Sequence, residues 1–180
     1  MPAQLAPRRL EPRPVTAVRR WVGMLVDLTL FSVGSAVLTF VLRVGAELSG
    51  LPEPDALDGY AAALSALVAG VATFLVPVLR GTGASTGQRL VWLTPTWADG
   101  PTFLRRLRAG SVGLGWALSF VLGALVDPEG PGQVVALALT VPAVLSPFLV
   151  LTTRGRRGLS LVVAGAELGD TRARADSLVP

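Results

Sequence analysis

Four long apolar runs divide the chain into spans and short polar segments. Each run holds 18 to 22 residues, and Asp27 is the single charged residue in any of them. The runs cover residues 21–42, 60–79, 109–126 and 133–152. A bilayer core is about 30 Å thick and a helix rises about 1.5 Å per residue, so about 20 apolar residues cross it. The pattern therefore predicts four membrane-spanning segments.

Each run should form a helix, because backbone polar groups in lipid must be paired within their own segment. A soluble helical bundle is the alternative, but core helices in water keep a polar face and these runs show no regular one. The first run is longer than the usual signal-peptide core of about 7–15 residues, which favours a retained span. We therefore expect an all-α membrane protein with four transmembrane helices.

Arginines are distributed unequally between the polar segments. All 16 basic residues are arginines, and 15 of them fall in residues 1–20, 80–108 and 153–180. Residues 43–59 and 127–132 together hold one arginine and six acidic residues. Because cytoplasmic loops carry an excess of Lys and Arg, this distribution predicts that both termini are cytoplasmic. It also predicts a structured cytoplasmic loop between the second and third helices.

Turn and proline signals set the expected boundaries. Residues 1–18 contain several prolines and are predicted to be a flexible cytoplasmic leader. Residues 19–168 form the predicted membrane domain, and residues 169–180 a flexible cytoplasmic tail. Within the middle loop, Thr102 is placed to cap a helix that begins near Phe103.

Composition narrows the possible functions. Hydrophobic residues make up 51% of the chain and charged residues 16%, against about 25% in soluble domains. Because there is no Cys and no His, disulfides, thiolate chemistry and imidazole ligands are excluded. The glycines near Gly87 resemble a phosphate loop, but no lysine accompanies them. We expect no catalytic set, no metal and no cofactor, and the arginines at the span ends do not suggest nucleic-acid binding.

Asp27 is the main candidate for a functional side chain. It lies about 10 Å along the helix from Arg20, and an acid at the bilayer centre costs about 2.5–3.5 kcal/mol. Such a residue should face a partner or a cavity. Gly23, Asp27 and Gly34 share one helix face, where the two glycines would allow close helix packing. The structural interpretation pairs Asp27 with an arginine; the functional interpretation makes it an ion or proton site.

Three arginines are candidate partners of Asp27. Arg20 is two turns away on a similar face, and Arg89 and Arg157 lie in the cytoplasmic segments. The fourth run contains Pro142 and Pro147, which should kink its helix, and Ser146 is placed to pair with a freed carbonyl. Further arginines before the third run are placed to reach anionic lipid headgroups: Arg105, Arg106 and Arg108.

Three short segments, in order along the chain, carry a resemblance to a known family. They are Arg20, Gly23 and Asp27 at the start of the first run, the Ser-Thr-Gly-Gln-Arg-Leu segment at 85–90, and the Arg-Arg-Gly-Leu segment at 156–159 followed by Ala-Gly. The chain resembles the RDD family of bacterial membrane proteins in these segments. It departs from the family pattern where Ser160 and Leu161 replace a His-Asp pair. The middle segment also lacks the Pro and Lys of the family pattern.

The resemblance implies a protein of the bacterial inner membrane. Some family members are linked to sodium/proton exchange, and others accompany larger membrane systems. Together with the small size and the lost acid, this favours a non-enzymatic accessory or scaffold component of a membrane system. A small oligomeric cation/proton transporter using Asp27 is the alternative. The expected partners are the lipid bilayer, anionic headgroups, and a larger complex or a second copy of the chain.

Overall fold

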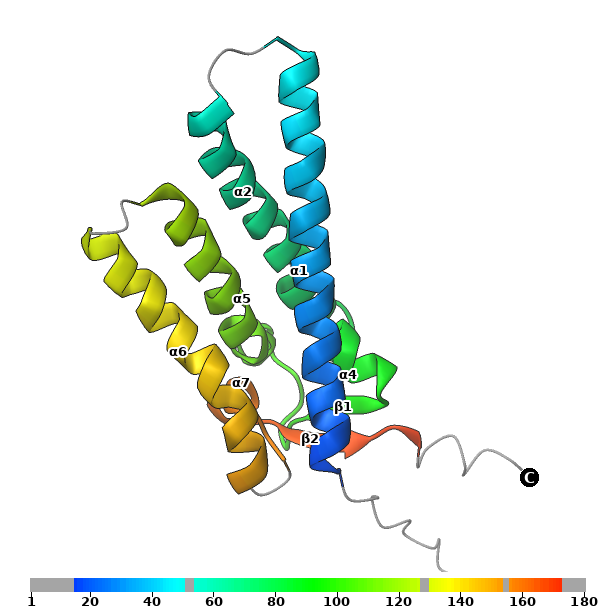
Figure 1. The fold of residues 1–180 in the computed structure, drawn as a ribbon. Helices are drawn as coiled ribbons and strands as arrows, with labels where there is room; N and C mark the ends of the chain where they lie inside the picture. The colour runs from blue at the N-terminus through cyan, green and yellow to red at the C-terminus, as the bar shows by residue number, and fades with distance from the viewer. Residues whose placement is uncertain (1–14, 51–53, 127–129, 154–155, 173–180) are drawn as a thin grey trace, which may run out of the picture.

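A computed structural model of the protein describes residues 15–50, 54–126, 130–153 and 156–172 (Figure 1). Four of its helical segments are long and apolar enough to cross a membrane, which confirms the four long apolar helices expected from the sequence. These segments are Ala17–Leu48, Asp58–Leu79, Phe103–Leu125 and Pro131–Thr152. Each is longer than the run from which it was predicted, because residues that flank the run belong to the same helix.

The first span is α1 (Ala17–Leu48), capped by the Thr16 side chain, which accepts a hydrogen bond from the Arg19 amide. The second consists of α2 (Pro54–Gly70), a π-helical turn η1 (Val71–Leu75) and α3 (Val76–Leu79). The third and fourth spans are α5 (Phe103–Leu125) and α6 (Pro131–Thr152). Thr102 caps α5 through its side chain, which confirms the helix start predicted there.

Two short helices and one two-stranded ribbon complete the fold. The middle loop contains α4 (Thr86–Leu90) and β1 (Leu93–Thr96). After α6 come α7 (Leu159–Val163) and β2 (Glu167–Asp170). The strands β1 and β2 pair antiparallel, with Leu93 opposite Asp170 and Thr96 opposite Glu167. The sequence pattern did not predict this ribbon.

All of these short elements lie at one end of the helical bundle, which we call the ribbon end (α4, β1, α7 and β2) (Figure 1). The first helix begins at this end and the fourth span finishes there. The described parts of the three arginine-rich segments therefore lie together. An even number of spans requires the chain to enter and leave the bundle at the same end, as it does here. The side of the membrane on which the ribbon end lies stays a prediction.

The core of the bundle is built from small residues around one aromatic ring. Phe31 of α1 packs with Ala66 and Ala69 of α2 and with Ala117 of α5. A Cβ built on Gly70 would overlap that of Ala117, so only glycine permits the observed approach of α2 to α5. Close contact through small residues is the usual mode of packing between membrane helices.

Large apolar side chains cover the outer surface of the long helices. Phe40 of α1, Leu137 of α6 and Phe148 of α6 are each more than 60% exposed. A soluble bundle would bury such residues, since exposed apolar surface in water is unfavourable. Their exposure is consistent with contact to lipid on the outside of the bundle.

The predicted ends of the membrane domain change slightly. The helix α1 begins at Ala17, two residues inside the predicted leader, and β2 continues to Asp170, two residues inside the predicted tail. The rest of the predicted leader up to residue 14, and residues 173–180 of the tail, lie outside the described residues.

Candidate functional site

The buried residues of α1 form one stripe that faces the other helices. They are Arg20, Gly23, Asp27 and Phe31, spaced three and four residues apart. This spacing places side chains on one face of a helix. Gly34 continues the stripe and lies 3.7 Å, measured from a built Cβ, from the Ala69 Cβ of α2. The face predicted from the glycine and aspartate spacing therefore points into the protein.

Asp27 accepts hydrogen bonds from the beginning of α4. The Ser85 Oγ donates to Asp27 Oδ2 at 2.5 Å, and the Gly87 amide donates to Oδ1 at 2.7 Å. Among the described residues these are the hydrogen-bond donors to the carboxylate. Each carboxylate oxygen therefore has a buried partner, which offsets the cost of placing an acid inside an apolar bundle.

The local sequence explains why α4 presents these donors. Ser85 is the N-cap of α4, and its side chain accepts from the Gln88 amide at 3.2 Å. The Gln88 side chain accepts in return from the Ser85 amide at 3.0 Å, which completes a capping box. The capping box fixes the first turn of this five-residue helix, so the Ser85 hydroxyl and the Gly87 amide reach Asp27 in a defined geometry.

Two glycines allow α4 to approach α1 closely. A Cβ built on Gly87 would overlap the Gly23 carbonyl oxygen and lie 2.9 Å from the Asp27 Cγ. A Cβ on Gly23 would lie 3.1 Å from the Gly87 carbonyl oxygen. The two backbones are therefore in contact. Gly23, the small residue expected beside Asp27, therefore packs against a second glycine in the middle loop, a contact that no sequence pattern predicted.

The predicted arginine partners of Asp27 do not supply its hydrogen bonds. Arg89 donates instead to the backbone carbonyls of Pro77 at 2.8 Å and Arg80 at 2.6 Å. At Arg157 the backbone carbonyl accepts from the Thr153 hydroxyl at 2.6 Å. Among the described residues, a hydroxyl and a backbone amide therefore donate the hydrogen bonds to Asp27, and its pairing with one of these arginines stays a prediction.

Arg20 is buried, with 3% of its surface exposed. Its Nε has no hydrogen-bond partner, and within the described residues no ion pair joins Arg20 to Asp27. Arg20 and Asp27 line the same cavity, so their opposite charges face a shared space. Arg20 therefore has no direct acidic contact in the part of the chain that is described.

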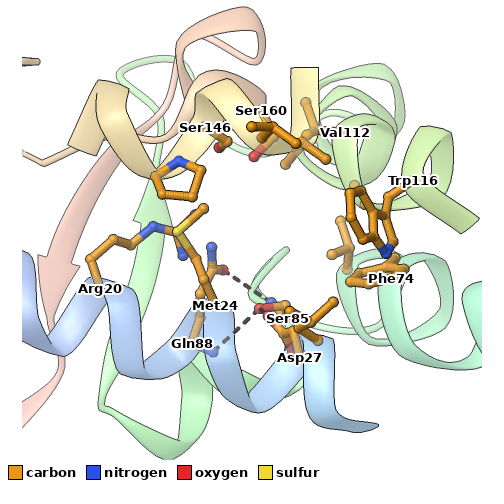
Figure 2. A pocket seen from close by; sticks show the side chains of 18 residues that line it. Arg20, Met24, Asp27, Phe74, Ser85, Gln88, Val112, Trp116, Ser146 and Ser160 are labelled. Atoms are coloured by element: carbon orange, nitrogen blue, oxygen red, sulfur yellow. Dashed lines mark hydrogen bonds between the residues drawn. The ribbon is translucent and has the colours of Figure 1, made fainter. Parts of the chain in front are cut away.

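A cavity of about 360 Å³ lies between the helices beside Arg20 and Asp27. Figure 2 shows Arg20 and Trp116 on opposite sides of it, with Ser146 and Ser160 near its upper edge. Residues of α1, η1, α5 and α6 contribute to its wall, together with those of α4 and α7. A cavity of this size is within the usual range of about 300–1,000 Å³ for small-molecule pockets.

Arg19, next to Arg20 in the chain, belongs to a different site at the ribbon end. Its Nη1 lies 2.5 Å from Asp170 Oδ2, and its Nη2 donates to the Val91 carbonyl at 2.5 Å. Arg172 also contacts Asp170, at 3.2 Å, and its guanidinium lies 5.6 Å from the Trp92 ring centroid. This cluster connects α1 to the ends of both strands.

Asp170 is held in its charged form at this cluster. Its pKa is lowered from the ordinary value, first by the hydrogen bond from Arg19, against a raising effect of burial, and further by the contacts with Arg172. The side chain of Asp170 has no exposed surface. This residue was not among the predicted site residues, because Asp170 falls in the expected flexible tail and its separation from Arg19 by 151 positions gives no local signal.

Other polar contacts fasten the fourth span. Trp21 Nε1 donates to the Pro147 carbonyl at 3.1 Å, which connects α1 with α6. Ser146 Oγ accepts from the Leu159 amide at 3.0 Å. Ser146 therefore binds the first residue of α7. Its expected hydrogen bond to a carbonyl left unpaired by Pro142 or Pro147 stays a prediction.

The structure places the three arginines before the third run within α5. Arg105 forms an ion pair of 2.9 Å with Asp99, and Arg106 donates to the Leu79 carbonyl at 3.2 Å. Arg108 is exposed. Across the described residues, no group of three or more acidic side chains is placed to hold a metal ion.

Comparison with protein-family models, with curated proteins and with solved structures gave no match. The resemblance to the RDD family therefore rests on the three sequence segments alone. The function of the chain has to be inferred from its own residues.

Proposed function

We propose that this chain is a multi-pass protein of a bacterial inner membrane, similar to the RDD family, and that it acts as a non-enzymatic accessory or scaffold component of a membrane system. The observation that carries this proposal is the use of Asp27. Both of its oxygens accept hydrogen bonds from α4, at 2.5 and 2.7 Å, so the carboxylate holds the middle loop against the first span. Asp27 used in this way is a structural residue, because it holds α4 of the ribbon end in place against α1.

The proposed topology places the ribbon end in the cytoplasm. The arginine distribution supports it, with 15 of 16 arginines in the segments predicted to be cytoplasmic. A ribbon end ordered by the Arg19–Asp170 ion pair would then offer a fixed cytoplasmic surface to a partner. The apolar outer faces of the long helices would offer lipid-facing surfaces to other membrane subunits or to a second copy of the chain.

Co-purification tests the accessory role. The tagged full chain would be expressed at its natural level, extracted from membranes in a mild detergent, and compared with a tagged unrelated four-span protein. We expect at least one membrane protein to be enriched in a fixed ratio to the chain, measured by quantitative mass spectrometry. The variant Gly87→Ala, which separates α4 from α1, should lose that partner, whereas Gly123→Ala should retain it. Recovery of the chain alone would contradict the proposal.

A second candidate is a small oligomeric cation/proton transporter using Asp27. The observation in its favour is that Asp27 and Arg20 both border the cavity between the helices. Purified protein in vesicles would then dissipate a pH gradient when sodium is added, and Asp27→Asn would stop the flux. Asp170→Asn is the matched control, because that acid lies outside the spans. Equal flux in wild type and Asp27→Asn would exclude this role for Asp27.

A further inference from the structure

Two buried N–H groups on the cavity wall lack hydrogen-bond partners. They are the Nε of Arg20 and the Nε1 of Trp116. A buried donor without a partner is unfavourable, and most such groups in proteins are satisfied. The two side chains lie on opposite sides of the same cavity (Figure 2). Both atoms are covered by their neighbours, but the Arg20 side chain lines the cavity and its guanidinium makes no hydrogen bond within the described residues.

The donors at the Arg20 side converge on one place. A Cβ built on Gly158 would lie 2.6 Å from Ser146 Oγ and 3.5 Å from Arg20 Nη2, so the guanidinium and this hydroxyl lie near each other. Ser146 Oγ accepts from the Leu159 amide, which leaves its own proton to be donated. Ser160 also lines the cavity. We call Arg20, Ser146 and Ser160 the polar end.

The cavity wall also holds Asp27, Ser85 and Gln88, whose side chains are hydrogen-bonded at the start of α4, and the rest of the wall is apolar. Phe74, Val112, Trp116 and Val144 contribute to its wall. A site with charged and hydroxyl donors at one end and aromatic and aliphatic walls at the other matches a ligand that has a polar head and a hydrocarbon chain. The Arg20 guanidinium has no ion pair or hydrogen bond within the described residues, whereas Asp27 on the same wall already accepts two hydrogen bonds from α4. The head that complements the guanidinium is therefore an anion.

We propose that this cavity binds a single-chain anionic amphiphile. Its carboxylate or phosphate head accepts hydrogen bonds from the polar end, and its hydrocarbon chain extends past Phe74 and Val112 toward Trp116. A head beside Arg20 supplies an acceptor for its guanidinium, which has none among the described residues. This inference goes beyond the accessory role and does not depend on it, because it concerns what the bundle holds and not which protein it joins.

The probe for this site is 11-bromoundecanoate, whose bromine quenches tryptophan fluorescence at the end of the chain remote from the carboxylate. The full chain would be placed in nanodiscs of zwitterionic lipid and titrated with the probe. We expect saturable quenching, and we expect Trp116→Phe to remove the saturable part while the other tryptophans remain. The neutral analogue 11-bromoundecanol should bind about tenfold to a hundredfold more weakly, as the loss of a charge-assisted hydrogen bond predicts.

Variants of the two ends separate the contributions of head and chain. Arg20→Gln should weaken binding of the acid about tenfold or more, with little effect on the alcohol, and Arg20→Lys should recover part of the loss. Val112→Phe should reduce binding of both probes by filling the apolar end. Val135→Phe is its matched control, because Val135 is exposed on α6 and does not line the cavity. If Arg20→Gln fails to fold, Ser160→Ala and the Val112 pair carry the test.

A last arm distinguishes a free acid from a bilayer lipid as the source of the anionic head. Nanodiscs that contain phosphatidylglycerol should compete with the probe if one chain of an anionic lipid occupies the cavity, and should leave it unaffected if only single-chain acids enter. Equal affinity for the acid and the alcohol would overturn the proposal. So would saturable quenching that persists in Trp116→Phe, or equal effects of Val112→Phe and Val135→Phe.

Discussion

Arg19 and Arg20 are adjacent in the chain but belong to two different regions. Arg19 lies at the ribbon end and contacts Asp170 and the Val91 carbonyl, each at 2.5 Å. Arg20 points into the bundle, where its Nε has no partner and a cavity lies beside it. Consecutive residues on a helix are rotated by about 100°, so a single step along α1 leads from one site to the other.

The two acids differ in the same way. Asp170 receives charged donors from two arginines, whereas Asp27 receives neutral donors from a hydroxyl and a backbone amide. Ion pairs of Asp170 therefore hold β2 to α1 at the ribbon end. Hydrogen bonds of Asp27 and the close contact of Gly23 with Gly87 hold α4 to α1. In the bundle, Arg20 lines the cavity without a hydrogen bond or ion pair among the described residues.

Among variants of the two regions, Gly87→Ala is expected to lower the free energy of unfolding the most. The new Cβ would overlap the Gly23 carbonyl and lie 2.9 Å from the Asp27 Cγ, so α4 must move away from α1. Losing both hydrogen bonds to a buried carboxylate should lower the free energy of unfolding by about 3 kcal/mol or more. Thermal unfolding in detergent measures the change. Gly123→Ala is the control, since no neighbour lies within 4 Å of its Cβ; an equal loss there would contradict the explanation.

Asp27→Asn should have the next largest effect. Asparagine can accept from the Gly87 amide and donate its NH₂ to the Ser85 Oγ, but the Ser85 proton then loses the buried acceptor that Asp27 provides. We expect the free energy of unfolding to fall by about 2 kcal/mol, the cost of one buried unsatisfied donor. Denaturant titration at neutral pH is the measurement. A smaller loss than in Asp170→Asn would reverse the ranking of the two regions.

Asp170→Asn should lower stability by about 1 kcal/mol at neutral pH, and this difference should depend on pH. The folded protein lowers the pKa of Asp170, so the stability that its charged form contributes is fully present above the unfolded pKa of about 3.9. That contribution is lost as the pH falls below this value toward the folded pKa. The stability gap between wild type and variant should therefore be constant from about pH 7 to about pH 5 and shrink in acid. A gap that widened in acid would have the wrong sign.

Arg172→Ala should have the smallest effect. The Arg172 side chain is 40% exposed, and it contacts Asp170 at 3.2 Å and the Trp92 ring at 5.6 Å. Exposed ion pairs and cation–π contacts contribute at most about 1 kcal/mol and are weakened by salt. We expect a loss of less than about 1 kcal/mol that becomes smaller at high ionic strength, measured by thermal unfolding. Arg19→Ala should cost more, because Arg19 also binds the Val91 carbonyl.

The four spans and the buried face of α1 could be predicted from the sequence. Both follow from local patterns: apolar run length for the spans, and three- and four-residue spacing for Gly23 and Asp27. The Thr102 cap is equally local, because a side chain satisfies an amide three residues further along. In each case the residues that decide the structure lie close together in the chain.

The ribbon and the true partners of Asp27 could not be predicted. The strands β1 and β2 have four residues each, contain Pro95 and Gly169, and lie far apart in the chain, so neither shows a strand pattern. A buried acid favoured an arginine as the partner of Asp27. A backbone amide is present at almost every position of a chain, so the sequence does not indicate which amide will bind Asp27. The contact appears only when Gly23 and Gly87 are known to meet.

The pairing of Arg19 with Asp170 also sets an order of assembly during synthesis. Because chains emerge from the ribosome N-terminus first, Arg19 is made at the beginning and its acid 151 positions later. All four spans must therefore have been made before this ion pair can form and β2 can close against β1. A nascent chain stopped before Glu167 would carry the four long apolar helices and still have an open ribbon end. Any partner that binds the closed ribbon end would therefore recognise only chains that extend past β2.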